Sequence, residues 1–168
     1  MILACGTSTE PLSDLGPVPD GPLRTDFTGY VARRLAGSAA PVLYRFTVIT
    51  HFENRGVVPL YLGRCLPDSP QPQFGVGVAD SAAAESAYDP VWACVGHDQQ
   101  FEVLPGASRV DTLTLQGPNL SDGHTHEGIG VTEGQFRLLF DVRLTRGGGV
   151  AAPDSVRRSN AFIVRTAQ

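Results

Sequence analysis

The residues with the clearest capacity for chemistry lie between Asp122 and Gly128, in the string Asp-Gly-His-Thr-His-Glu-Gly. On an extended backbone, side chains two residues apart point to the same side. His124 and His126 can therefore bind one metal ion together, with a carboxylate oxygen from Asp122 or Glu127 as a further ligand. The alternative is a solvated glycine-rich loop with two exposed imidazoles, because a histidine pair without buried supporting partners binds metals weakly.

The sequence lacks the residues that most other catalytic sites need. All 13 basic residues are arginine, so the chain has no lysine for a Schiff base, a P-loop or a Ser-Lys dyad. No Gly-x-Ser-x-Gly elbow occurs, and Ser121, Asp122 and His124 are too close in the chain for a catalytic triad. The net charge of −4 argues against a nucleic-acid surface. We therefore predict a protein without enzymatic activity and without a cofactor.

The three cysteines predict a compartment outside the cytoplasm. Cys5 follows two aliphatic residues and an alanine, a string that resembles the lipobox of bacterial lipoproteins, in which the cysteine is lipidated. Because a signal peptide needs a charged start and an apolar run of about 7–15 residues, either the true start lies further upstream or this resemblance is accidental. Cys65 and Cys94 remain as a pair, and a disulfide between them would stabilise the fold by roughly 3.5 kcal/mol. The alternative is two free, buried thiols.

Strands dominate the expected secondary structure, because apolar and polar residues alternate along most of the chain, as they do in half-buried strands. The clearest runs cover residues 42–52 and 135–144. Asn54-Arg55-Gly56 predicts a hairpin turn after the first of these runs, with a positive φ at the glycine, and Pro105-Gly106 predicts a type II turn. Only residues 80–88, with three consecutive alanines, have a helical composition.

This pattern predicts an all-β fold, namely an antiparallel immunoglobulin-like β-sandwich of about seven to nine strands. A closed barrel is the main rival. A proline- and glycine-rich arm covers residues 1–23, and the folded domain covers 24–168. The arm is expected to be an extended tether, or to add a strand to the sheet edge of a neighbouring copy. Residues 117–134 and 146–158 are expected to form glycine-rich, exposed loops.

Five strings of turn and core residues carry a resemblance to known proteins: Thr25-Asp26-x-x-x-Tyr30, Phe52-x-Asn54-x-Gly56-x-x-Pro59-x-Tyr61-Leu62-x-x-Cys65, Leu104-Pro105-Gly106, Gly134-Gln135-Phe136-Arg137-Leu138 and Ser159-Asn160-x-Phe162. Together they resemble uncharacterised secreted bacterial proteins with immunoglobulin-like domains. The Pro-Gly turn and the Gly-x-aromatic-Arg start of a strand are also similar to the BsuPI-type intracellular proteinase inhibitor fold. The resemblance covers roughly residues 25–166 and implies a fold, and it assigns no active-site residue.

These features predict an extracytoplasmic, non-enzymatic binding or assembly module that is lipid-anchored through Cys5. The alternatives are a metal-binding protein that uses His124 and His126, a proteinase inhibitor, and a subunit of an extracellular homopolymer that uses its N-terminal arm. The expected partner is another protein or a second copy, with membrane contact only through the lipid anchor. Because lysine is missing, any bound anion must meet arginine, and outward-facing arginines at positions 45, 137 and 143 are the first candidates.

Overall fold

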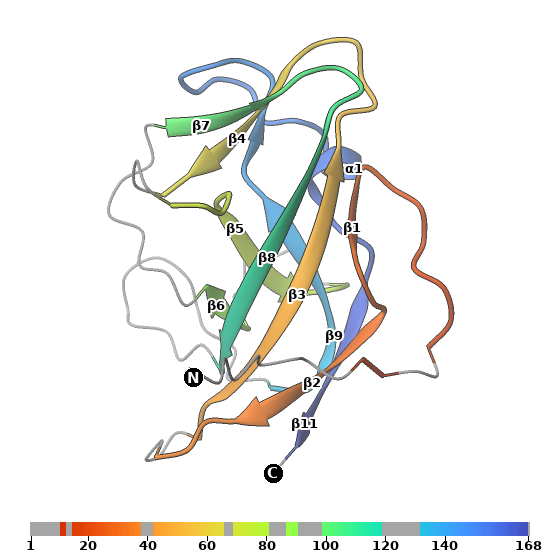
Figure 1. Cartoon of the computed structure of the whole chain (residues 1–168), viewed down its shortest axis with the longest axis vertical. Helices are drawn as coiled ribbons and strands as arrows, with labels where there is room; N and C mark the ends of the chain where they lie inside the picture. The colour runs from red at the N-terminus through yellow and green to blue at the C-terminus, as the bar shows by residue number, and fades with distance from the viewer. Residues whose placement is uncertain are drawn as a thin grey trace, which may run out of the picture.

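The molecule is built around one large curved sheet, with a smaller sheet at one end (Figure 1). The computed structural model describes residues 11–12, 15–37, 42–65, 69–80, 87–90, 99–118 and 132–167. In these ranges the strands are β1 (Leu23–Thr25), β2 (Gly29–Arg34), β3 (Tyr44–Glu53), β4 (Leu60–Arg64), β5 (Phe74–Val78), β6 (Asp89–Pro90), β7 (Gln99–Val103), β8 (Ser108–Gly117), β9 (Gly134–Phe140), β10 (Val142–Arg143) and β11 (Phe162–Ala167). The helix is α1 (Asp154–Arg157).

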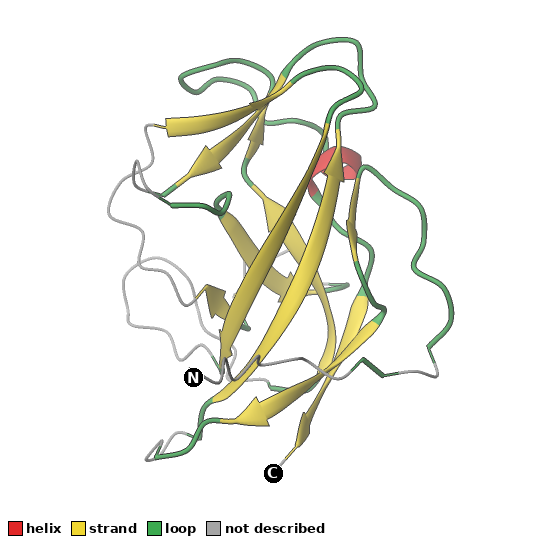
Figure 2. Cartoon of the chain, viewed as in Figure 1, coloured by secondary structure: helices red, strands yellow, loops and turns green. Residues whose placement is uncertain are grey.

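The large sheet is nearly closed into a barrel (Figure 2). Its strand order is β5-β9-β11-β2-β3-β8-β6, and β1 also pairs with β3. The two ends of this path meet, because Val76 of β5 forms a bridge with Tyr88, directly before β6. The N–H of Ala87 donates to the carbonyl of Val76 at 3.0 Å. The all-β class with mainly antiparallel pairing is confirmed, and the near closure is the geometry of the rival barrel interpretation.

The pairing partners of the last strand, β11, could not be predicted from the alternation of apolar and polar residues. β11 lies between β9 and β2, and it is antiparallel to β9 but parallel to β2. The register places Val164 opposite Tyr30 and Phe162 opposite Phe136. An early strand, β2, and the last strand, β11, are therefore neighbours in the barrel wall.

The small sheet, of order β10-β4-β7, covers one end of the barrel. β10 continues the line of β9 after Asp141, whose carbonyl accepts a hydrogen bond from Gly63 of β4 at 2.8 Å. The hairpin expected at residues 54–56 is wrong, because β3 pairs with β8 along its whole length while β4 belongs to the other sheet. Gly56 is also not among the glycines with positive φ.

The core explains why these strands form where they do. In β9 and β10 the alternating side chains of Phe136, Leu138, Phe140 and Val142 are all fully buried, as the periodicity of this segment predicts. Full burial stabilises each such side chain by about 1.5–3 kcal/mol relative to exposure. A large apolar core therefore rests on the regular alternation of a few long strands.

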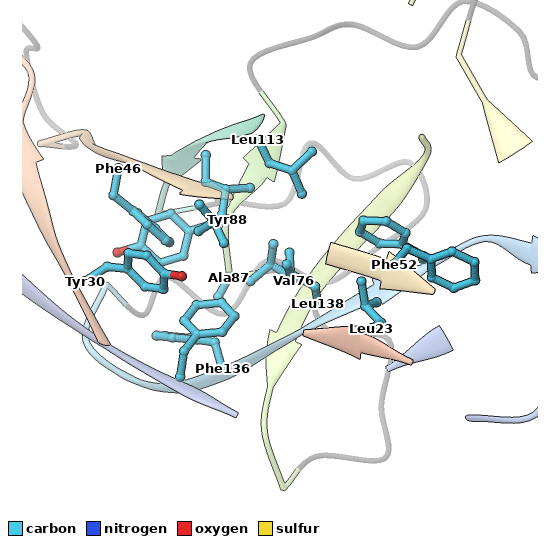
Figure 3. Close-up of a cluster of buried hydrophobic side chains, with 14 of the residues drawn as sticks. Leu23, Tyr30, Phe46, Phe52, Val76, Ala87, Tyr88, Leu113, Phe136 and Leu138 are labelled. Carbon is cyan, nitrogen blue, oxygen red and sulfur yellow. The ribbon is translucent and has the colours of Figure 1, made fainter. Parts of the chain in front are cut away.

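Aromatic rings fill the middle of the barrel (Figure 3). The ring of Phe46 lies 5.6 Å from that of Tyr30 and 4.9 Å from that of Tyr88, and Tyr88 lies 5.6 Å from Phe136, centroid to centroid. A Cβ on Gly117 would lie 2.8 Å from the carbonyl oxygen of Ala87 and would also meet the ring of Tyr88. The chain therefore needs a glycine where β8 passes the closure of the barrel.

Helix α1 lies within residues 146–158, which were expected to be loop throughout. It follows Pro153, and Asp154 forms ion pairs with Arg157 and Arg158 at 2.9 and 3.0 Å. The helix expected over 80–88 falls mostly outside the described residues, but Tyr88 lies in a β-bridge, so the expectation is wrong there. No helix in the described ranges is long and apolar enough to cross a bilayer.

Candidate functional site

Three connections gather at the end of the molecule that the small sheet covers, at the top of Figure 1. We call residues 54–59, 104–107 and 144–150 the loop end; they connect β3 to β4, β7 to β8 and β10 to the segment before α1. Apolar side chains point into solvent here: Val57 is 92% exposed, Val150 69%, Leu104 56% and Val58 51%. We take the loop end as the candidate site because exposed apolar side chains occur on all three of its connections, and apolar groups that gather on a surface are typical of interaction sites.

Asn54 forms hydrogen bonds with two of these connections. Its side chain is fully buried, and its amide nitrogen donates to the carbonyls of Val58 at 2.8 Å and Val103 at 2.9 Å. Its Oδ1 accepts the N–H of Gly56 at 3.0 Å. The backbone of Asn54 adds two hydrogen bonds to the 104–107 turn, of 2.8 and 3.0 Å. The exposed tips therefore stand on a rigid base, because every polar atom of the asparagine side chain has a partner.

The turn between β7 and β8 places Leu104 at the edge of this surface. Gly106 has a φ of 74°, and the N–H of Ala107 donates to the carbonyl of Leu104 at 2.9 Å. This is the hydrogen bond of a β-turn with glycine in the position that requires positive φ. The turn expected from Pro105-Gly106 is confirmed.

The third connection, residues 144–150, contacts the small sheet. Arg146 reaches Glu102 at 3.2 Å and lies over the ring of Tyr61 at 6.0 Å. The N–H of Gly147 donates to the side chain of Gln100 at 2.9 Å. Residues 144–150 are thus held beside β4 and β7 by exposed polar contacts, which are individually weak.

Charges at the loop end are paired within the molecule. Arg55 binds Asp20 in a two-point ion pair, at 2.6 and 2.9 Å, and Glu53 at 2.8 Å. The hydrogen bonds from Arg55 hold the pKa of the Asp20 carboxyl below its ordinary value. Since these charges already have partners, the surface favours apolar contact over anion binding or acid–base chemistry.

A second polar cluster lies on the inner side of the small sheet and of β8. The buried carboxylate of Asp111 pairs with Arg109 at 2.6 Å, and the guanidinium of Arg109 stacks 3.6 Å above the ring of Phe101. Arg64 lies over the same ring at 4.7 Å. Arg109 also donates to the carbonyl of Pro70 at 2.6 Å. This network ties β7, β8 and residues 69–73 together and leaves Asp111 engaged with its own strand neighbour.

Polar residues of the resemblance strings act as cross-links between distant strands. Asn160 accepts the N–H of Thr25 and donates to its hydroxyl, both at 2.9 Å. The hydroxyl of Tyr30 donates to Asp26 at 2.6 Å, and burial together with this carboxylate raises the pKa of Tyr30. Ser159 accepts the N–H of Leu138 at 2.9 Å. The structure gives these residues a role in holding the fold.

The three arginines proposed for anion binding are not gathered at one point. Arg45 in β3 bonds Gln116 at 2.8 Å, and Arg137 in β9 bonds the carbonyl of Ser159 at 2.9 Å. Arg143 in β10 pairs with Asp141 at 2.6 Å. Each arginine thus has a separate partner on its own part of the surface.

Most of the predicted site residues lie outside the described residues. His124 and His126 do, as do Cys5 and Cys94, so the metal site, the lipidation site and the Cys65–Cys94 pair stay predictions. Cys65, half-buried after β4, takes part in a disulfide bond. Within the described ranges, no group of three histidine, cysteine or acidic side chains could hold a metal ion.

No protein-family model matches the chain, and no curated protein does either. The sequence predicts Asn54 only as a turn residue. Its available signal was the Asn-x-Gly spacing, which is typical of an asparagine that bonds the backbone two residues on, as it does here with Gly56.

Proposed function

We propose that the protein is an extracytoplasmic, non-enzymatic binding module whose loop end contacts another protein. One observation supports this above all: Asn54 bonds the loop that exposes Val57 and Val58 and also Val103, which directly precedes the exposed Leu104. The proposed partner surface is an aliphatic recess without net charge, because the arginines of the loop end already bind carboxylates.

The proposal depends on loops that are already ordered before a partner binds. Binding residues are commonly placed on loops that a rigid scaffold positions, and loops that are ordered beforehand lose less entropy when a partner binds. The buried asparagine supplies that order here: its side chain bonds Gly56 and Val58 in one loop and Val103 at the end of β7, and its backbone bonds the 104–107 turn. The barrel supplies the scaffold.

The remaining parts of the proposal rest on sequence. An anchor at Cys5 and a bridge between Cys65 and Cys94 would place the module on the cell surface or in the periplasm. An immunoglobulin-like relationship, with the two sheets as a sandwich, belongs to the same proposal and is supported by the resemblance strings alone. Metal binding by His124 and His126, and proteinase inhibition, are alternatives that metal analysis and inhibition assays test directly.

The test places a photo-crosslinking amino acid at position 57 in cells that make the protein. Position 49 is the matched control, because Ile49 is also apolar and exposed but lies in the barrel wall. We expect one defined adduct from position 57, a purified partner that binds the intact protein, and at least a tenfold loss of affinity in Val57→Asp. Missing or equal adducts at the two positions, or unchanged affinity of the variant, would contradict the proposal.

A further inference from the structure

A short segment of the N-terminal arm completes the barrel wall beside β2. Here β2 pairs with β3 only at Arg33 and Arg34, and β1 pairs further along β3. Pro11 forms an antiparallel bridge with Tyr30, and the N–H of Leu12 donates to the carbonyl of Gly29 at 3.2 Å. The arm therefore adds a minimal strand to the edge of β2.

The surface of β2 that the arm contacts has a glycine, Gly29, where the arm lies closest. The three atoms nearest to a Cβ built on Gly29 all belong to Leu12 and Leu15, with Leu12 Cβ at 3.1 Å. Gly29 lies in an ordinary strand and has no positive φ. A glycine is therefore needed at position 29 because a larger side chain would collide with the arm, and not because of the backbone conformation. Two half-buried leucines of the arm occupy the space that a side chain would fill. We call Pro11, Leu12 and Leu15 the strap.

The connection between the strap and β1 suits transfer to another molecule. Residues 16–22 contain three prolines, which favour an extended chain of about 3 Å per residue. The hydroxyl of Thr28 reaches the carbonyl of Gly16 at 3.2 Å, and Asp20 is held by the exposed pair with Arg55. Among the described residues, the strap contributes one backbone hydrogen bond, from Leu12, and the two leucine side chains that lie over Gly29.

We infer that the strap is an exchangeable strand, and that the surface around Gly29 accepts the strap of a second copy of this chain. A swapped pair makes the same contacts between molecules that the single chain makes within itself. The internal strap competes at an effective concentration of about 1 mM, as expected for a short linker. Exchange between molecules therefore needs a local chain concentration of about 1 mM. This requirement does not depend on the loop end.

Two full-length variants separate donor from acceptor. Leu12→Asp with Leu15→Asp destroys the strap and keeps the acceptor surface, whereas Gly29→Val blocks the acceptor and keeps the strap. Neither variant can exchange with itself. In neither variant can the chain's own strap occupy its own acceptor surface, so no internal strap competes. Mixed in equal amounts at about 1 mM total chain, the two variants should form a heterodimer in sedimentation velocity, with a dimer fraction at least tenfold above that of either variant alone.

The controls keep the outcome unambiguous. Gly75→Val adds the same bulk to a strand glycine with open space around it, and its own strap still competes, so it should pair far less with the donor-blocked variant. If Gly29→Val fails to fold by circular dichroism, Gly29→Ala replaces it. Adding Val57→Asp to both partners should leave the heterodimer intact, which distinguishes this inference from the loop-end proposal. A mixture of folded variants that stays monomeric would overturn it.

Discussion

Replacing Asn54 with alanine tests whether the loop end is held by one buried side chain. The substitution removes three hydrogen bonds and leaves the carbonyl of Val103 buried without its donor. An orphaned buried group costs about 1–3 kcal/mol, and each of the two part-buried bonds contributes about 0.5–1 kcal/mol. We therefore expect Asn54→Ala to lower the free energy of unfolding by about 2–5 kcal/mol.

The assay is denaturant unfolding with the slope checked for equality between variants, together with thermal unfolding. For a chain of this size the predicted loss corresponds to a decrease in Tm of about 4–20 °C. Asn54→Asp should be at least as destabilising at neutral pH, because a carboxylate accepts but cannot donate to the two carbonyls. Hydrogen exchange at Gly56 should accelerate in Asn54→Ala, since its N–H donates to the asparagine Oδ1. The carboxylate of Asn54→Asp still offers that N–H an acceptor, so exchange at Gly56 should change less there.

Arg55→Ala is the matched control in the same loop. It removes ion pairs to Asp20 and Glu53 whose side chains are well exposed, and exposed pairs contribute little. We expect its free energy of unfolding to stay within about 1 kcal/mol of the native chain. If Asn54→Ala costs no more than Arg55→Ala, the two loops are not held by the buried amide and the argument for a preorganised surface fails.

Three further predictions concern the scaffold. Gly117→Ala should destabilise the fold by about 1–3 kcal/mol through overpacking, whereas Gly75→Ala, with open space around it, should cost clearly less in the same denaturation assay. Burial raises the pKa of Tyr30, so stability should be complete below the ordinary tyrosine value of about 10 and fall above it; Tyr30→Phe should flatten that slope. Intact mass should rise by two hydrogens on reduction if Cys65 and Cys94 are bridged, and peptide mapping that joins Cys65 to another cysteine would refute the pair.

Alternation predicted the strands well because it depends only on which face of each strand is buried. The inward residues Phe46, Val48 and Phe52 of β3 are buried as the period of two requires. Partner choice was not predictable in the same way. A turn at Asn54 suggested a hairpin, but β3 pairs with β8, far along the chain, and no local pattern encodes that pairing. The four-residue helix α1 was missed for a related reason, since it buries no residue and so has no apolar period.

Strand glycines show most clearly where local sequence stops being informative. Glycine was expected mainly at turns, yet Gly29, Gly63 and Gly117 all lie within strands at close approaches between distant segments. A Cβ on Gly63 would meet the carboxylate of Asp141 where the small sheet joins the large one, and one on Gly117 would meet Tyr88 where the barrel closes. The third, Gly29, receives the strap. Each is a place where one segment approaches the backbone of another, whereas Gly75, also in a strand, has open space around it. The sequence alone does not distinguish these two kinds of strand glycine, because the approaching segment is identified only by the fold.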